Sequence, residues 1–284
     1  MGSRIDNRIM RVSEWIAIVY FLCVILLLFF SSLAWRRRIW VLLSSSALVA
    51  LLLLLPYGER LFLPQFLPVA RDWLPLLMIL AAYYQAGLLI SSRRDHAWEQ
   101  RLLAWDKALL EQSWLHRLRA SARWLEQFGE GSYLLCYLVV PLAIPILYLA
   151  RQQALVDQFW SAVLPAVLLC YGVSPFFPSL PPRSSAPGLH LPGKSLLLRR
   201  VNLWVLKYCS IQSTIFPSAH VAAATATTLA LTRVLPQVGV VYLVVAMGIA
   251  LGSVFGRYHY AADSILGVLA GVAGFALSGW LFPP

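Results

Sequence analysis

The sequence predicts an all-α protein, a bundle of about eight transmembrane helices with one further amphipathic helix at the membrane surface. Hydrophobic residues make up 60% of the 284 residues and charged residues only 12%, whereas about a quarter of a soluble domain is charged. The mean hydropathy is +0.72. The 11 Trp and 12 Tyr residues suit a chain that meets two membrane–water interfaces. A water-soluble enzyme is therefore excluded.

The apolar residues gather in runs close to the roughly 20 residues that cross a bilayer. We predict spans at residues 15–35, 39–55, 73–90, 132–150, 158–178, 219–235, 237–255 and 260–281. Arg4, Arg8 and Arg11 precede the first run, which is longer than the core of a signal peptide, so we interpret it as a retained span. Prolines inside the fourth and fifth runs predict kinks.

Two stretches between the spans differ from them in composition. Within residues 91–130, Trp98, Leu102, Trp105 and Leu109 recur at helical spacing among charged residues. This spacing favours an amphipathic helix on the membrane surface, or alternatively a helix that gates lipid access.

The second stretch, residues 174–218, is a basic, proline-rich loop, which is where a functional site is expected. The chain therefore divides into three spans at 1–90, the amphipathic helix at 91–130 and a catalytic core at 131–284.

One carboxylate occurs after residue 157, and it lies four residues after a histidine. His259 and Asp263 share a helix face at this spacing. A carboxylate can hold the proton on Nδ1 and leave Nε2 free as a nucleophile or base. The alternative is a buried pair that only joins two helices.

A second motif precedes the sixth span. It reads Phe216-Pro217-Ser218-Ala219-His220, and Pro and Ser are residues that start helices. Ser218 is expected to cap the helix, and the free amides of its first turn can bind a phosphate. The alternative is a plain cap with His220 at the level of the headgroups.

Topology brings the motifs together. His220, His259 and the loop with Arg183 all lie on one side of the membrane in the eight-span arrangement. Two histidines, a carboxylate, a helix start and arginines suit phosphoryl transfer through a phosphohistidine. One histidine would attack, the other would protonate the leaving oxygen, and Arg and amides would hold the equatorial oxygens.

Pro-Ser-Ala-His, followed 39 residues later by His-Tyr-Ala-Ala-Asp, resembles two motifs of the type 2 phosphatidic acid phosphatase superfamily. These are membrane lipid phosphatases and phosphotransferases that need no metal. The resemblance implies that His259 is the nucleophile, Asp263 its orienting partner and His220 the acid. It implies a phosphate site at Arg183, Ser218, Ala219 and Arg257, with no metal and no cofactor.

The sequence departs from the common pattern of that family at three places. Ala219 replaces a glycine, and Ser253 replaces an arginine, with Arg257 standing nearer the histidine. The first motif is missing, and Lys194 with Arg199 and Arg200 only approximates it. Instead, Pro-Pro-Arg183 and the Arg-Tyr-His-Tyr at 257–260 resemble the inositol phosphorylceramide synthase branch. The Trp-Asp-Lys at 105–107 is more weakly similar to that branch.

The predicted partners are a lipid phosphate, the bilayer and an alcohol acceptor such as a ceramide or an inositol lipid. The formal charge of +11 fits headgroups or phosphate, and no nucleic-acid module is visible. Three alternatives remain: a zinc hydrolase with His220, His259 and Asp263 as ligands, a Ser218–His259 peptidase, and a non-enzymatic protein that binds or transports lipid phosphates.

The loops on the side of the site carry more basic residues than those on the other side, which by the positive-inside rule would place the site in the cytoplasm. Arg183, Arg257 and the 91–130 helix supply this excess for functional reasons. Most relatives in the resembling family have the site outside. We therefore expect a multi-pass protein of the cell membrane with an outward-facing site.

Overall fold

The protein is a bundle of helices in the computed structural model, which describes residues 10–61, 66–90, 95–110, 123–185 and 197–283. Within these ranges it has no strand, only a bridge between Ser179 and Thr214. Three 3₁₀ turns lie at Leu135–Tyr137, Gln153–Leu155 and Ser174–Phe176. The helices are α1 (Val12–Phe29), α2 (Trp35–Leu61), α3 (Leu67–Leu89), α4 (His96–Leu110), α6 (Arg123–Leu134), α7 (Val139–Leu149), α8 (Val156–Val173), α9 (Pro182–Ser185), α10 (Leu197–Cys209), α11 (Ala219–Val234), α12 (Pro236–Phe255) and α13 (Ala261–Leu281).

Among the described residues, six helices are long and apolar enough to cross a membrane, so the chain is a multi-pass membrane protein. They correspond to the predicted spans 15–35, 39–55, 73–90, 158–178, 237–255 and 260–281. The predicted span 132–150 instead forms a pair of helices bent by 67° near Leu138, which would be a seventh span if counted as one.

The predicted span 219–235 corresponds to α11. This helix has 16 residues, or about 24 Å, which is short of the roughly 30 Å of hydrocarbon. The predicted count of eight is therefore not confirmed.

The centre of the bundle is built from small residues. Helix α11 packs against α8, α12 and α13, and most of its side chains are alanine or threonine. Glycines on α13 face it: a Cβ at Gly267 would lie 2.7 Å from the carbonyl oxygen of Ser218, and one at Gly271 would lie 2.8 Å from that of Ala222. Such small-residue faces let helix backbones approach closely in membranes. The start of α11 is thereby held against the start of α13.

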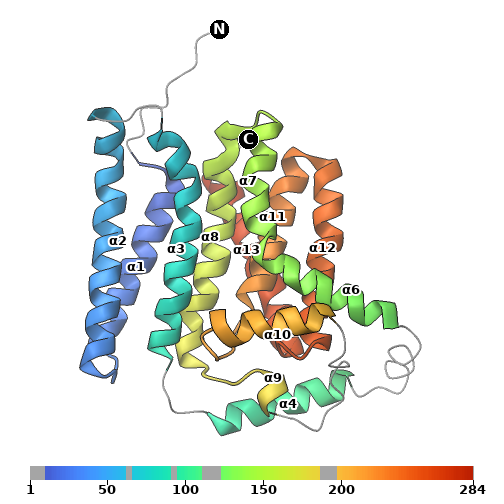
Figure 1. The fold of residues 1–284 in the computed structure, drawn as a ribbon. Helices are drawn as coiled ribbons and strands as arrows, with labels where there is room; N and C mark the ends of the chain where they lie inside the picture. Colours follow the sequence, from blue (N-terminus) through green and yellow to red (C-terminus); the bar gives the residue numbers. More distant parts are fainter. Residues whose placement is uncertain (1–9, 62–65, 91–94, 111–122, 186–196, 284) are drawn as a thin grey trace.

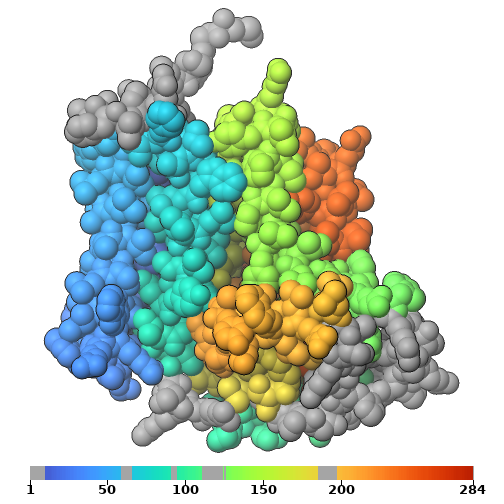
Figure 2. Space-filling model, viewed as in Figure 1, coloured from blue at the N-terminus to red at the C-terminus, as the bar shows by residue number. Residues whose placement is uncertain are grey.

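The two ends of the bundle are formed by different elements (Figure 1). Helices α1 and α3 begin, and α13 ends, at the upper end of the view, whereas α4 and α9 lie beyond the lower end. Helix α10 lies across the front of the lower half, and in the space-filling view it covers that part of the surface (Figure 2).

Of the amphipathic stretch 91–130, the described residues form α4 and the start of α6, so a single amphipathic helix is not confirmed. Residues 91–94 and 111–122 lie outside the described ranges. In α4, Leu102 is buried and Trp98 packs on Phe216, whereas Trp105 and Leu109 are exposed. One side of α4 thus faces the protein. Its place on a membrane surface and the three-part division of the chain stay predictions.

Candidate active site

The loop between α12 and α13 brings His259 and Asp263 together. Asp263 is the third residue of α13, and its Oδ2 accepts a hydrogen bond of 3.2 Å from the amide of Tyr260, the residue before the helix. Acids at this position commonly cap a helix in this way. The same oxygen lies 3.2 Å from Nδ1 of His259, and both side chains are buried. One carboxylate therefore caps the helix and contacts the histidine.

This contact decides which nitrogen of His259 can react. A carboxylate at Nδ1 favours the tautomer with the proton there, which leaves the lone pair on Nε2. Burial and, to a smaller extent, the Arg183 guanidinium lower the pKa of His259 to about 3. The imidazole is therefore neutral near pH 7, the state that a nucleophile requires.

His220 reaches the same place from α11. Its ring centroid lies 6.2 Å from that of His259, with the ring planes nearly perpendicular, and it also contacts the rings of Tyr133 and Tyr137. Ser218 caps α11, since its Oγ accepts a hydrogen bond of 3.5 Å from the amide of Val221. The amide of Ser218 donates to the carbonyl of Asp263 at 3.0 Å. The two sequence motifs are thus bonded to each other.

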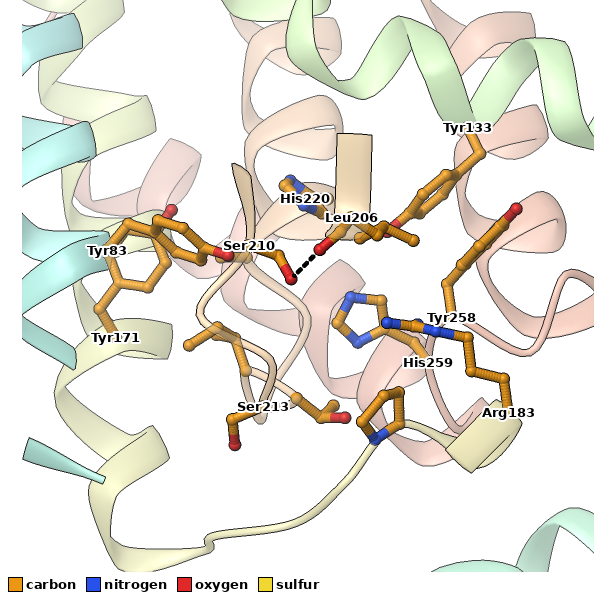
Figure 3. A pocket seen from close by; sticks show the side chains of 14 residues that line it. Tyr83, Tyr133, Tyr171, Arg183, Leu206, Ser210, Ser213, His220, Tyr258 and His259 are labelled. Atoms are coloured by element: carbon orange, nitrogen blue, oxygen red, sulfur yellow. Dashed lines mark hydrogen bonds between the residues drawn. The ribbon is translucent and has the colours of Figure 1, made fainter. Parts of the chain in front are cut away.

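A pocket opens between these residues (Figure 3). Its open space, including the mouth, is about 460 Å³. Arg183, Tyr258 and His259 lie on one side of it, whereas Tyr83 and Tyr171 lie on the other. The remaining lining residues are Tyr133, Pro181, Leu206, Ser210, Ser213, Thr214, Ile215, Ala219 and His220.

Arg183 lies on the short helix α9, half-buried at the pocket. Its guanidinium carbon is 5.8 Å from the centre of the Tyr258 ring, a cation–π distance. Its amide donates to the carbonyl of Arg257 at 3.2 Å, which joins the α9 loop to the His259 loop. Burial lowers the pKa of Arg183, although a guanidinium stays charged at any physiological pH.

Two of the four predicted phosphate residues lie away from the pocket lining. Ser218 is fully buried and does not line the pocket. Arg257 is also buried, with a φ of 62°, and its Nη1 lies 3.4 Å from Oδ2 of Asp106 on α4. Its Nε and Nη2 have no hydrogen-bond partner among the described residues. Arg183 and Ala219 are the predicted phosphate residues that line the pocket.

Sequence reasoning missed a buried polar network behind Tyr258. The Tyr258 hydroxyl donates to Glu130 Oε2 at 2.6 Å, and Arg199 Nη1 donates to Glu130 Oε1 at 2.7 Å and to the carbonyl of Gly256 at 2.9 Å. The Tyr258 ring stacks on Tyr133, with centroids 4.0 Å apart. Glu130 is the last of six acids in the charged stretch 91–130, so its sequence position did not distinguish it. Lys194 lies outside the described residues.

Metal ligation gains no support from the described ranges. In them, no group of three or more His, Cys, Asp and Glu side chains is close enough to hold a metal ion.

One comparison with known proteins identifies the chain. A family model described as the PAP2 superfamily matches residues 100–277, from α4 to most of α13. Neither a curated protein nor a solved structure matches. Helices α1 to α3, with Tyr83 of the pocket lining, lie outside the match, whereas every predicted catalytic and phosphate-binding residue lies inside it.

Proposed function

Because the chain belongs to the type 2 phosphatidic acid phosphatase (PAP2) superfamily, we propose that it removes or transfers a lipid phosphate through a phosphohistidine. Members of this superfamily are generally phosphatases or phosphotransferases. One observation carries the proposal: a neutral, carboxylate-bound His259 shares a pocket with a second histidine and with Arg183. These are the groups that metal-free phosphoryl transfer requires.

In the first step, Nε2 of His259 attacks the phosphorus atom of the lipid phosphate. The bond from phosphorus to the lipid oxygen breaks, and the protonated form of His220 gives that oxygen its proton and becomes neutral, so a free lipid alcohol leaves. Asp263 stabilises the charge that grows on the His259 ring, as an orienting carboxylate does in other nucleophile–base pairs.

The oxygens on phosphorus need positive groups during this step. Arg183 is the cation that lines the pocket, and a guanidinium can bind two phosphate oxygens at once. The first turn of α11, where Ser218 caps and Ala219 lines the pocket, adds amide groups. We propose that Arg257 supports this site from behind the pocket, through the carbonyl that holds the Arg183 amide.

In the second step, a hydroxyl attacks the phosphohistidine, His220 takes its proton, and the bond from Nε2 to phosphorus breaks. Water as acceptor makes a phosphatase, whereas a ceramide or an inositol lipid makes a phosphotransferase. The Pro-Pro-Arg183 loop and the Arg-Tyr-His-Tyr at 257–260 support the transferase. We further propose that the site faces outward from the cell membrane.

The test is turnover by the purified protein in detergent with EDTA. Labelled phosphatidic acid, a polyprenyl phosphate and a sphingoid-base phosphate are supplied in turn, with and without ceramide or an inositol lipid. We expect phosphate release or a labelled product lipid, and neither in His259→Ala. Loss of turnover in EDTA with recovery on added zinc would favour a zinc hydrolase. Binding without turnover, unchanged in His259→Ala, would favour a binding protein.

A further inference from the structure

Helix α4 carries two carboxylates on the face that it buries under the site. Glu99 and Asp106 are 6% and 2% exposed, and Leu102 lies between them at 0%. Spacings of three and four residues put all three on one face. A buried carboxylate is costly unless its oxygens are bonded, so the partners of these two show what α4 holds.

Glu99 holds the loop that carries Arg183. Its Oε1 accepts a hydrogen bond of 2.8 Å from the amide of Leu180, three residues before Arg183. The carbonyl of Leu180 in turn accepts a bond of 3.0 Å from the hydroxyl of Tyr260, the residue after His259.

Asp106 holds the chain on both sides of His259. Its Oδ1 accepts a hydrogen bond of 2.8 Å from the amide of Ala261, the first residue of α13. Its Oδ2 lies 3.4 Å from Nη1 of Arg257, two residues before the histidine. His259 therefore lies in a short loop segment whose two ends are tied to one carboxylate.

We infer that Glu99 and Asp106 are positioning residues for the reaction: Glu99 places Arg183 toward the phosphate, and Asp106 places His259 for attack. The inference rests on the proposed function and adds an element, α4, that contributes no residue to the pocket lining. It predicts that the two residues fail in different ways. A role limited to docking α4 predicts the same failure for both.

The charge state of Asp106 provides a further test, because a role limited to docking α4 would not make the activity depend on it. The pKa of Asp106 is raised to about 6, because burial outweighs the opposing effects of the Ala261 amide and Arg257, and Asp263 on α13 adds to the rise. Asp106 is therefore ionised, and paired with Arg257, above about pH 6, and it is neutral below. Activity that depends on the pair falls as the pH drops through about 6, and Asp106→Asn imitates the neutral acid.

The experiment compares Glu99→Gln and Asp106→Asn with Asp95→Asn. Asp95 is exposed directly before the same helix, and its Oδ1 accepts the Trp98 amide at 3.0 Å, a cap that Asn also provides. The probe is the lipid phosphate that the wild-type protein turns over fastest in EDTA. We measure kcat and KM from pH 5 to 8.

We expect Glu99→Gln to raise KM up to about tenfold, because the amide oxygen of Gln still accepts from the Leu180 amide but lacks the charge that strengthens such a bond. Its kcat should be nearly unchanged. Asp106→Asn should lower kcat at least tenfold. It should also lack the decrease in activity that the wild type shows as the pH drops through about 6. The control should match the wild type.

Equal losses of kcat in both variants, with unchanged KM and pH profile, would overturn the inference, as would wild-type behaviour in both. If Asp106→Asn does not give monodisperse protein, the KM of Glu99→Gln decides alone. Absence of turnover in the wild type would instead refute the proposed function itself.

Discussion

The two ends of the bundle both bury charged side chains, but only one end fills their hydrogen bonds. At the end where α1 and α3 begin, Arg71 donates from Nε and Nη2 to the two oxygens of Glu14, each at 2.7 Å. Asp157 on α8 accepts from the amides of Val12 and Ser13 and from the Ser13 hydroxyl. Asp72 accepts from Arg11 and from Tyr148. These bonds join α1 and α3 to α7 and α8.

At the other end, around His259, the buried polar groups are not saturated. Nε and Nη2 of Arg257, Oδ1 of Asp263, Nε of Arg199 and Oγ1 of Thr214 are buried without a partner among the described residues. Each such atom costs about 1–3 kcal/mol. The saturated end lies mostly outside the family match, whereas the unsaturated end contains the proposed site, so we expect the first to matter for stability and the second for the reaction.

The largest effect that this comparison predicts is the loss of the nucleophile. His259→Ala should abolish turnover of every substrate, because no other residue can accept the phosphoryl group in its place. It should also trap no acid-labile phosphoenzyme in a rapid quench with labelled substrate, while its thermal unfolding in detergent stays close to that of the wild type. A phosphoenzyme in this variant would show that another residue is the nucleophile.

His220→Ala should have a large effect that depends on the substrate. General acid catalysis contributes about 10² to 10⁴ in rate, and a lipid alkoxide needs it more than a nitrophenolate does. We therefore expect severe impairment on a lipid phosphate and substantial recovery on nitrophenyl phosphate, with His259→Ala inactive on both. Equal losses on both substrates for the two variants would favour shared metal ligation over separate roles.

Substitutions at the saturated end should lower the stability of the protein and leave its catalysis unchanged. Glu14→Gln leaves Arg71 buried without its counter-charge, and breaking a buried pair in this way costs about 3–5 kcal/mol. We expect a lower unfolding midpoint in detergent, with an unchanged kcat for the protein that remains folded. The double variant Glu14→Gln/Arg71→Gln should recover part of the loss. A tenfold fall in kcat with an unchanged midpoint would contradict the division between the two ends.

Local spacing explains what the sequence could predict of the site. His259 and Asp263 are four residues apart at a helix start, and Ser218 caps the helix that begins at the next residue. Both features can be predicted from neighbouring residues without knowledge of the fold. Glu99, Asp106 and Glu130 meet partners 81 to 155 residues away, which no local pattern reveals. The same limit applies to the spans, since only packing shows that α11 can be short in the centre of the bundle and that the chain bends near Leu138.

The smallest effect on activity should come from the network of Tyr258, Glu130 and Arg199 behind the pocket. Tyr258→Phe removes the hydroxyl that donates to Glu130 Oε2, but that oxygen keeps a bond of 2.8 Å from Asn202, and Arg199 still bonds Oε1. The ring, its stacking on Tyr133 and its contact with Arg183 all remain. We therefore expect a stability loss of about 1 kcal/mol and a change in kcat/KM below fivefold. Tyr258→Leu, which removes the aromatic face, is the matched comparison and should raise KM more than Tyr258→Phe does. If Tyr258→Phe instead loses as much activity as His220→Ala, the hydroxyl takes part in the reaction and the network is catalytic.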